Sequence, residues 1–251
     1  LYLWQRLDVL ARSAGQGVAA LLAPGLFGLA LLYLWQIVVT GFAVPQVLLP
    51  APAQVASVLG NRADILWPDF RQTFLKAVLA GFAIGNAAGF LTAMVADRIA
   101  FLKRGVLPLC NLASAMPIVG IAPIMVMWFG FDWQSKAAVV AVVTFFPMLV
   151  NTLAGLASVD AMHRDLMHSY GASPGQTFAK LRLPSALPFV FNALKVNSTL
   201  ALIAAIVAEF FGSPILGLGF RISTEVARLN VDVVWAVIAV AALAGSVFYG
   251  A

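Results

Sequence analysis

The chain has 251 residues, of which 62% are hydrophobic and only 10% are charged, and its formal net charge is +5. A soluble domain carries roughly 25% charged residues, so this chain has too few polar groups to cover a surface exposed to water. Its basic residues are scattered between apolar runs and form no continuous stripe, which argues against nucleic acid as a partner. The composition therefore indicates a protein that lies in a lipid bilayer.

A helix that crosses a membrane needs about 20 mostly apolar residues. Several such runs predict an all-α, polytopic helical membrane protein with about six transmembrane helices, and they lack the alternation that a membrane β-strand shows. The predicted spans are residues 19–41, 70–96, 104–130, 135–157, 186–211 and 231–251. Residues 1–18 are expected to form a cytoplasmic N-terminal segment. Residues 42–69 are expected to form a Pro-rich extracytoplasmic segment with room for a short helix at 53–61.

Lys and Arg residues are more frequent on one side of these spans, and cytoplasmic connections normally carry this excess. The bias predicts that the N-terminus is cytoplasmic. Lys76 and Lys195 fall inside predicted spans near their ends, where a long aliphatic stem lets the charged group reach the interface. The basic residues expected on the cytoplasmic side are Arg6, Arg12, Arg98, Lys103, Arg104, Arg164, Lys180 and Arg182.

The second and third spans contain residues that alter helix packing or regularity. Gly81, Gly85 and Gly89 recur every four residues, so they share one helix face and favour close packing against another helix. Proline residues are expected to kink the third span. Membrane helices tolerate such kinks where they are buried in protein or line a cavity, so a structural role and a pathway-lining role both stay open for residues 111–123.

The sequence offers no catalytic or metal-binding pattern. It lacks a Gly-Lys-Ser/Thr phosphate loop, so the chain itself is not expected to bind nucleotide. Cys110 is the single cysteine, and His163 and His168 are five residues apart, a spacing that does not place both imidazoles on one helix face. We therefore expect neither an enzyme nor a bound metal or cofactor.

Glu209 is the strongest candidate for an ionisable residue inside the membrane, and such residues often mark a transport pathway. Its position near the outer end of the fifth span leaves two roles open. It either packs or is solvated at the helix end, or it contacts a gate or a ligand. A single carboxylate is a thin basis for ion coupling, so the driving energy is expected from a partner. An ion-coupled secondary transporter or a channel stays as the alternative function.

The longest inner connection, residues 158–185, is the most informative segment. The stretch before Gly171 is compatible with a helix, and Gly171 permits a sharp backbone reversal. Ser173 and Pro174 then predict an N-cap followed by proline at the first helical position. A second short helix is expected from Pro174 to about Leu181, with Pro184 beginning the next span. Two short helices joined in this way form a rigid projection that can enter a cleft of a partner.

This segment resembles the Glu-Ala-Ala-x-x-x-Gly-(nine residues)-Ile-x-Leu-Pro loop of ABC importer permeases. The spacing from Gly171 to Leu183-Pro184 fits, and Asp165 stands where the pattern has Glu. The two small alanines are replaced by Leu166 and Met167, so the docking surface is expected to be bulkier. Further short segments look like the nitrate/sulfonate/taurine-type permeases over about residues 45–251. They include Leu49-Pro50-Ala51-Pro52, Met116-Pro117-Ile118, Trp128-Phe129-Gly130, Ala208-Glu209 and Gly217-Leu218-Gly219.

The resemblance implies a type I ABC importer permease (MetI-like) fold, with a core at 70–251 and a cytoplasmic coupling loop at 160–184. It implies a multi-pass protein of the bacterial inner membrane that moves a small solute into the cytoplasm by alternating access. The implied partners are two ATPase subunits that bind ATP and Mg, a second copy of the permease and an extracytoplasmic solute-binding protein. The stretch 208–228 looks closest to the branch that imports pyrimidine thiamine precursors or riboflavin, with a sulfonate- or nitrate-type solute as the alternative.

Two sets of site residues follow. The residues expected to couple to the ATPase are Asp165, Leu166, Met167, Tyr170, Gly171, Ala172, Pro174, Leu183 and Pro184. The candidates for the pathway or gate are Asn111, Ser114, Met116, Pro117, Asn151, Asn197 and Glu209. A largely apolar pathway with a few amides and a hydroxyl is expected to suit a neutral heterocycle.

Overall fold

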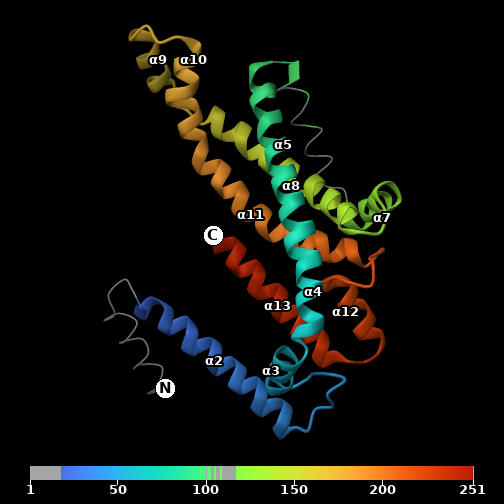
Figure 1. The fold of residues 1–251 in the computed structure, drawn as a ribbon. Helices are drawn as coiled ribbons and strands as arrows, with labels where there is room; N and C mark the ends of the chain where they lie inside the picture. Colours follow the sequence, from blue (N-terminus) through green and yellow to red (C-terminus); the bar gives the residue numbers. More distant parts are fainter. Residues whose placement is uncertain (1–17, 100, 103–104, 106–107, 109–116, 251) are drawn as a thin grey trace. The chain divides into compact units, whose positions relative to one another are not determined.

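The computed structural model describes residues 18–250 except 100, 103–104, 106–107 and 109–116, and all regular structure in these ranges is helical (Figure 1). The first helices are α2 (Val18–Gly41), α3 (Pro52–Asn61), α4 (Ala63–Phe70), the π-helix η1 (Arg71–Val78), α5 (Leu79–Arg98) and α7 (Ile118–Phe129). They are followed by α8 (Trp133–Ala157), α9 (Ala161–Ser169), α10 (Pro174–Thr177), the π-helix η2 (Phe178–Arg182), α11 (Leu183–Glu209), α12 (Leu218–Ala227) and α13 (Val231–Gly250).

Five helical segments in the described ranges are long and apolar enough to cross a membrane. They are Pro24–Gly41, Ala63–Arg98, Trp133–Ala157, Pro174–Glu209 and Val231–Gly250. These segments confirm the first, second, fourth, fifth and sixth predicted spans. The third, predicted at 104–130, lies partly outside the described residues, and its described part is the shorter apolar helix α7.

The second and fifth spans are longer than predicted. α4, η1 and α5 form one segment of 36 residues, and so do α10, η2 and α11. At 1.5 Å per residue each is about 54 Å long, so its ends extend beyond a hydrocarbon core of about 30 Å. The second short helix that was expected to end near Leu181 is therefore wrong: the chain passes Pro184 without a break. Membrane helices accommodate proline through local π-helical turns, and η2 ends two residues before Pro184.

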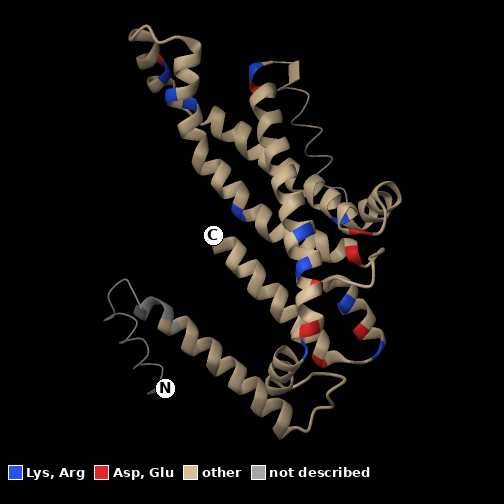
Figure 2. Ribbon diagram, in the orientation of Figure 1, with Lys and Arg blue, Asp and Glu red and all other residues tan. Residues whose placement is uncertain are grey.

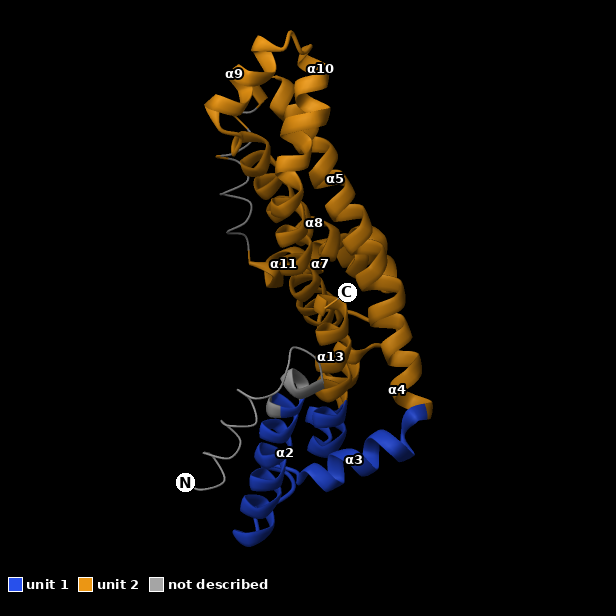
Figure 3. Ribbon diagram, turned by 90° about the vertical axis from the view of Figure 1, so that its left-hand side faces the viewer, with its two compact units in different colours: residues 1–63, 225–236 blue, residues 64–224, 237–251 orange. Residues whose placement is uncertain are grey.

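The chain divides into two compact units, which Figure 3 colours separately. Unit 1 comprises residues 1–63 and 225–236, and unit 2 comprises 64–224 and 237–251. Within unit 1 the rings of Trp35 and Trp235 lie 4.9 Å apart, and the Gln36 side chain accepts a hydrogen bond of 3.1 Å from the Ala53 N–H. These contacts join α2 to α3 and to the beginning of α13.

Unit 2 is built around α8, which packs along α5 and along α11. Gly81, Gly85 and Gly89 lie where α5 meets α8. A Cβ atom at Gly81 would lie 2.6 Å from Val140 Cβ, and one at Gly85 would lie 2.8 Å from Ala141 Cα. Real Cβ atoms do not come so close, so a side chain at these positions would push the helices apart. The glycine stripe therefore has the packing role that its spacing predicted.

Candidate coupling hairpin and polar tiers

Residues 160–182 form a projecting pair of helices that we call the coupling hairpin, consisting of α9, α10 and η2 (Figure 1). α9 begins after Asp160, whose carboxylate accepts a hydrogen bond of 3.4 Å from the Met162 N–H. At its other end Gly171 has φ +65°, and its N–H donates to the His168 carbonyl at 2.9 Å. The left-handed backbone at Gly171 makes the predicted reversal, which a residue with a Cβ adopts only under strain.

The second arm of the hairpin begins with the predicted cap. Ser173 and Gln176 form a capping box, in which the Gln176 N–H donates to Ser173 Oγ at 3.3 Å and the Ser173 N–H donates to Gln176 Oε1 at 2.8 Å. Pro174 occupies the first helical position, where its missing N–H leaves no donor unpaired. Both arms are thus fixed by local hydrogen bonds, so the hairpin is stiff without a large core of its own.

The outer face of α9 exposes apolar side chains. Met162, Leu166 and Tyr170 recur every four residues, and they are 76%, 51% and 79% exposed. A hollow of about 230 Å³ lies beside them, lined by Met162, His163, Asp165, Leu166 and Ser169. An exposed apolar helix face next to a hollow is typical of a surface that another protein covers.

The structure brings the predicted coupling residues from Asp165 to Pro174 together in this hairpin. Leu183 and Pro184 lie instead in the first turn of α11, at the base of the hairpin. His163 lies 3.8 Å from Asp160 on the exposed surface. No group of three or more His, Cys, Asp or Glu residues that could hold a metal ion occurs in the described part of the chain.

Sequence reasoning missed a cluster at the base of the hairpin. The Arg182 guanidinium pairs with Asp97, the second-last residue of α5, through contacts of 2.8 Å and 2.9 Å. It also donates to the Leu156 carbonyl in the last turn of α8, at 3.1 Å and 3.2 Å. Nearby, Arg98 lies over the Phe178 ring, 5.8 Å from its centroid. Arg182 therefore joins the hairpin to the ends of two other helices, and we call this cluster the inner tier.

A second cluster joins the same three helices near the middle of their length. Asn197 on α11 is fully buried, and its Nδ2 donates to Asn86 Oδ1 on α5 at 2.6 Å and to the Thr144 carbonyl on α8 at 2.8 Å. Asn86 in turn donates to the Phe82 carbonyl at 2.7 Å. We call this the middle tier. Asn197 was a candidate for the pathway, and the structure places it between helices of one chain.

Glu209 is the centre of a third cluster at the end of unit 2 opposite to the hairpin, the outer tier. Its side chain is buried, so it does not reach water. One carboxylate oxygen accepts a hydrogen bond of 2.7 Å from Thr73 Oγ1, and the other accepts one of 2.7 Å from the Gly219 N–H. Thr73 Oγ1 itself accepts from the Leu218 N–H at 2.8 Å. Gly217 has no room for a side chain, because its Cβ would lie 2.5 Å from Glu209 Oε1. These contacts anchor the beginning of α12.

Two further carboxylates, of Asp69 and Asp132, complete the outer tier. Asp69 accepts a hydrogen bond of 2.8 Å from the Gly217 N–H and pairs with Arg221 at 2.7 Å. Asp132 caps α8 and accepts from the Gln72 side chain at 2.6 Å. The Gln72 amide holds the pKa of the Asp132 carboxyl below its ordinary value, and the hydrogen bond from the Trp133 N–H adds to this effect. Asp132 therefore keeps its charge, and with it the cap, at mildly acidic pH.

The predicted pathway residues do not meet in one site. Asn111, Ser114 and Met116 lie outside the described residues. Pro117 is exposed at the start of α7, and Asn151 donates to the Pro147 carbonyl of its own helix at 2.8 Å. The residues that bind Glu209 and Asn197, such as Thr73 and Asn86, carried no sequence signal beyond being polar side chains within apolar runs.

The described part of the chain is a bundle of long apolar helices, and a capped hairpin with exposed apolar side chains projects from it. This architecture is typical of the membrane subunits of transporters. A match to a known family defines the class of this protein further. Residues 85–251 match the family described as "Binding-protein-dependent transport system inner membrane component", and the chain belongs to this family. It is therefore a multi-pass inner-membrane permease subunit of a binding-protein-dependent ABC importer.

Several curated relatives are similar over most of their length. A "Probable ABC transporter permease protein" of Haemophilus influenzae is 32% identical over 86% of this chain and 87% of its own. The "Formylaminopyrimidine transport permease protein ThiX" of Halalkalibacterium halodurans is 35% identical over 79% of each chain. The "Riboflavin transport system permease protein RibX" of Chloroflexus aurantiacus is 30% identical over 85% of this chain and 80% of its own.

A solved structure supports the fold. The MetNI methionine ABC transporter, in an inward-facing conformation, contains a chain that matches with a TM-score of 0.58. The sequences are 19% identical, and the match covers 76% of this chain and 93% of that one. The predicted MetI-like fold is therefore confirmed.

Proposed function

We propose that the chain moves a small solute into the cytoplasm by alternating access, driven by ATP hydrolysis on a separate subunit. The observation that carries this proposal is the coupling hairpin: a stiff projection with an exposed apolar face, tied through Arg182 to α5 and α8. A partner that binds the hairpin therefore applies its force to the ends of α5 and α8 as well as to α11. Ligand-driven shifts between two states need such a rigid link between the site that is gripped and the element that moves.

The proposed partners follow from the family. Two ATPase subunits bind ATP and Mg and receive the hairpins of two permease copies. An extracytoplasmic binding protein delivers the solute to the outer segments, at 42–69 and 212–230. The names of the ThiX and RibX relatives favour a pyrimidine thiamine precursor or a flavin as the solute, and a sulfonate- or nitrate-type solute is the second candidate.

Two substitutions at Gly171 test this function. Asn tolerates the left-handed backbone that Gly171 adopts, whereas the β-branched Val does not. Gly171→Val is expected to abolish co-purification of a soluble ATPase and ATP-driven uptake into vesicles, while Gly171→Asn keeps much of both. Membrane levels of the two variants serve as the control. Equal coupling in both variants would remove the hairpin from the mechanism. Uptake that persists without ATP and collapses with an ion gradient would establish the alternative, an ion-coupled transporter.

A further inference from the structure

Lys195 lies about midway along the helix between Arg182 and Glu209. It is the one charged residue of α11 before Glu209, and Figure 2 shows a blue segment partway along this helix. At 1.5 Å per residue, Lys195 lies about 20 Å along the helix axis from Arg182 and about 21 Å from Glu209. Along the helix it is thus about equally far from the residues of the inner and outer tiers, and its expected reach to the interface stays a prediction.

Lys195 belongs to a polar stripe on the exposed face of α11. Asn192, Lys195 and Thr199 are spaced i, i+3 and i+7, so they lie on one side of the helix, and all three are exposed. The opposite side, which includes Asn197 and Ala201, is buried against the rest of unit 2. Charged and polar side chains at this depth are costly in contact with lipid, and they normally face a protein interior or a water-filled cavity.

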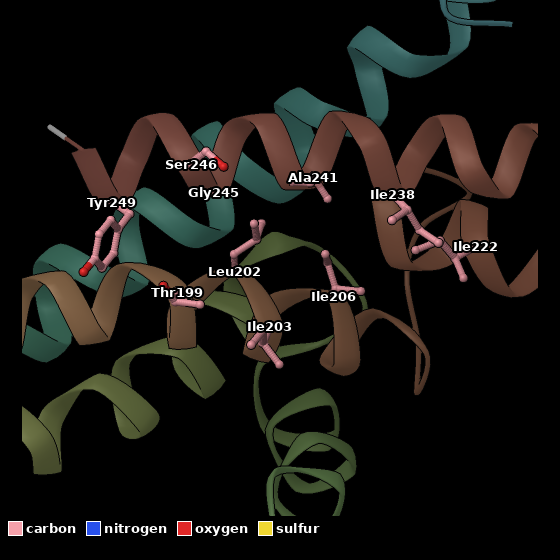
Figure 4. Close-up of a pocket in the computed structure, with 11 residues that line it drawn as sticks. Thr199, Leu202, Ile203, Ile206, Ile222, Ile238, Ala241, Gly245, Ser246 and Tyr249 are labelled. Atoms are coloured by element: carbon pink, nitrogen blue, oxygen red, sulfur yellow. The ribbon is translucent and has the colours of Figure 1, made fainter. Parts of the chain in front are cut away.

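The stripe continues into a groove between α11 and α13, with a volume of about 670 Å³ (Figure 4). Thr199, Ser246 and Tyr249 lie at one end of it, and the Lys195 ammonium lies 5.8 Å from the centroid of the Tyr249 ring. The other end is aliphatic, and it is lined by Ile206, Ile222 and Ile238. The groove thus has a polar end, with Lys195 next to it beside Tyr249, and an apolar end. Its size is typical of small-molecule sites.

We propose that this groove is part of the solute pathway, and that Lys195 binds an anionic or carbonyl oxygen of the solute while its apolar part lies along the isoleucines. This proposal rests on the proposed function and names the chemistry of its solute. A phospholipid is a poor occupant, because its phosphate stays at the interface, about 15 Å from mid-membrane. If a second copy of the chain covered the groove, it would have to place an anion against Lys195, because burying the ammonium without a partner is costly in free energy. The neutral heterocycle expected from the sequence must therefore carry an electronegative oxygen.

Accessibility to water tests the location of the groove. Single cysteines replace Lys195, Thr199 or Ser246 in a Cys110→Ala background, in the complete complex in membrane vesicles. Val247→Cys is the matched control: it neighbours Ser246 in the sequence, but it does not line the groove and is 73% exposed in the single chain. A membrane-impermeant anionic methanethiosulfonate is expected to modify the three groove positions severalfold faster than position 247.

The charge of Lys195 is tested at Thr199→Cys. The ratio of modification rates for anionic and cationic methanethiosulfonates is expected to fall roughly tenfold when Lys195 is replaced by Met, and to be restored by Arg, because a cation concentrates anions in a cleft. Rates equal to that of position 247 in every nucleotide state would mean a lipid-facing groove. Modification only after the complex is dissociated would mean an interface between copies. Either result overturns the proposal. Labelling needs no ATP hydrolysis, so this outcome is independent of the Gly171 experiment.

Discussion

The inner tier makes a prediction that can be worked out from its geometry. Arg182 holds Asp97 through two short contacts, of 2.8 Å and 2.9 Å, and its remaining donors satisfy the Leu156 carbonyl. The Asp97 side chain is only 3% exposed, whereas that of Arg182 is 25% exposed. The two partners are therefore unequal: Asp97 has little access to water if it loses Arg182, but Arg182 can turn to water if it loses Asp97.

This inequality sets the expected magnitudes. Removing one partner of a fully buried ion pair costs about 3–5 kcal/mol, and exposed pairs contribute about 0–1 kcal/mol. Arg182→Gln removes both contacts to the buried Asp97 carboxylate and the guanidinium donors to the Leu156 carbonyl, so we expect a loss of about 2–4 kcal/mol. Asp97→Asn keeps one oxygen acceptor, and the Arg182 charge that loses its partner can reach water, so a loss of about 1–2 kcal/mol is expected. Arg182→Lys keeps the charge but not the bidentate geometry of the guanidinium, so its loss of stability should lie between those of the other two variants.

Unfolding titrations with SDS in mixed micelles measure these losses, and ATP hydrolysis by the assembled complex, with and without loaded binding protein, measures coupling. Lys180→Gln is the matched control, since it removes a positive charge from the same π-helix at an exposed position. The double variant Asp97→Asn/Arg182→Gln should lose less than the sum of the single losses. If Arg182→Gln matches Lys180→Gln in both assays, or if the two single losses add, the inner tier does not join the helices as described.

Two further variants test other contacts. Gly85→Ala places a Cβ atom 2.8 Å from Ala141 Cα, so α5 and α8 must separate, and the free energy of unfolding in the same titration should fall by about 1–3 kcal/mol. Gly28→Ala is the control and should be close to neutral, because a Cβ atom there has nothing within 4 Å. Equal effects of the two variants would contradict the close packing of α5 against α8. Glu209→Gln keeps one oxygen acceptor but loses the other, so amide hydrogen exchange at 217–219 should accelerate, whereas unchanged protection would mean that Glu209 does not anchor the loop.

The features that the sequence predicted correctly are local ones. Runs of apolar residues located the spans, and the Ser173-Pro174 pair located a helix start, because each depends on residues within a few turns of one another. The polar tiers join residues far apart in the chain: Asp97 and Arg182 are 85 residues apart, and Thr73 and Glu209 are 136 apart. No periodicity within one helix states which residue of another helix will lie beside it.

The questions that the sequence left open have the same origin. Glu209 was expected either to pack or be solvated at the helix end, or to contact a gate or a ligand, because its partners, among them the N–H groups of a glycine-rich loop, have no local signature. The structure shows its carboxylate packed and hydrogen-bonded at the helix end. Lys195 was expected near a span end. The structure ties Arg182 and Glu209 to other helices, and Lys195 lies about midway between these two residues along the helix.

The three tiers together indicate how α5, α8 and α11 move. Apolar packing alone drives helix association weakly in lipid, so small residues and hydrogen bonds between helices carry much of it. Arg182, Asn197 and Glu209 supply such bonds at the inner, middle and outer levels of the continuous helical segment formed by η2 and α11, about 18–23 Å apart along the helix. Bending α11 away from α5 would break at least one tier and leave buried polar groups unpaired, whereas rotating the helices together breaks none. A force on the coupling hairpin should therefore swing these helices as one rigid body, carrying the exposed stripe of Lys195 with them.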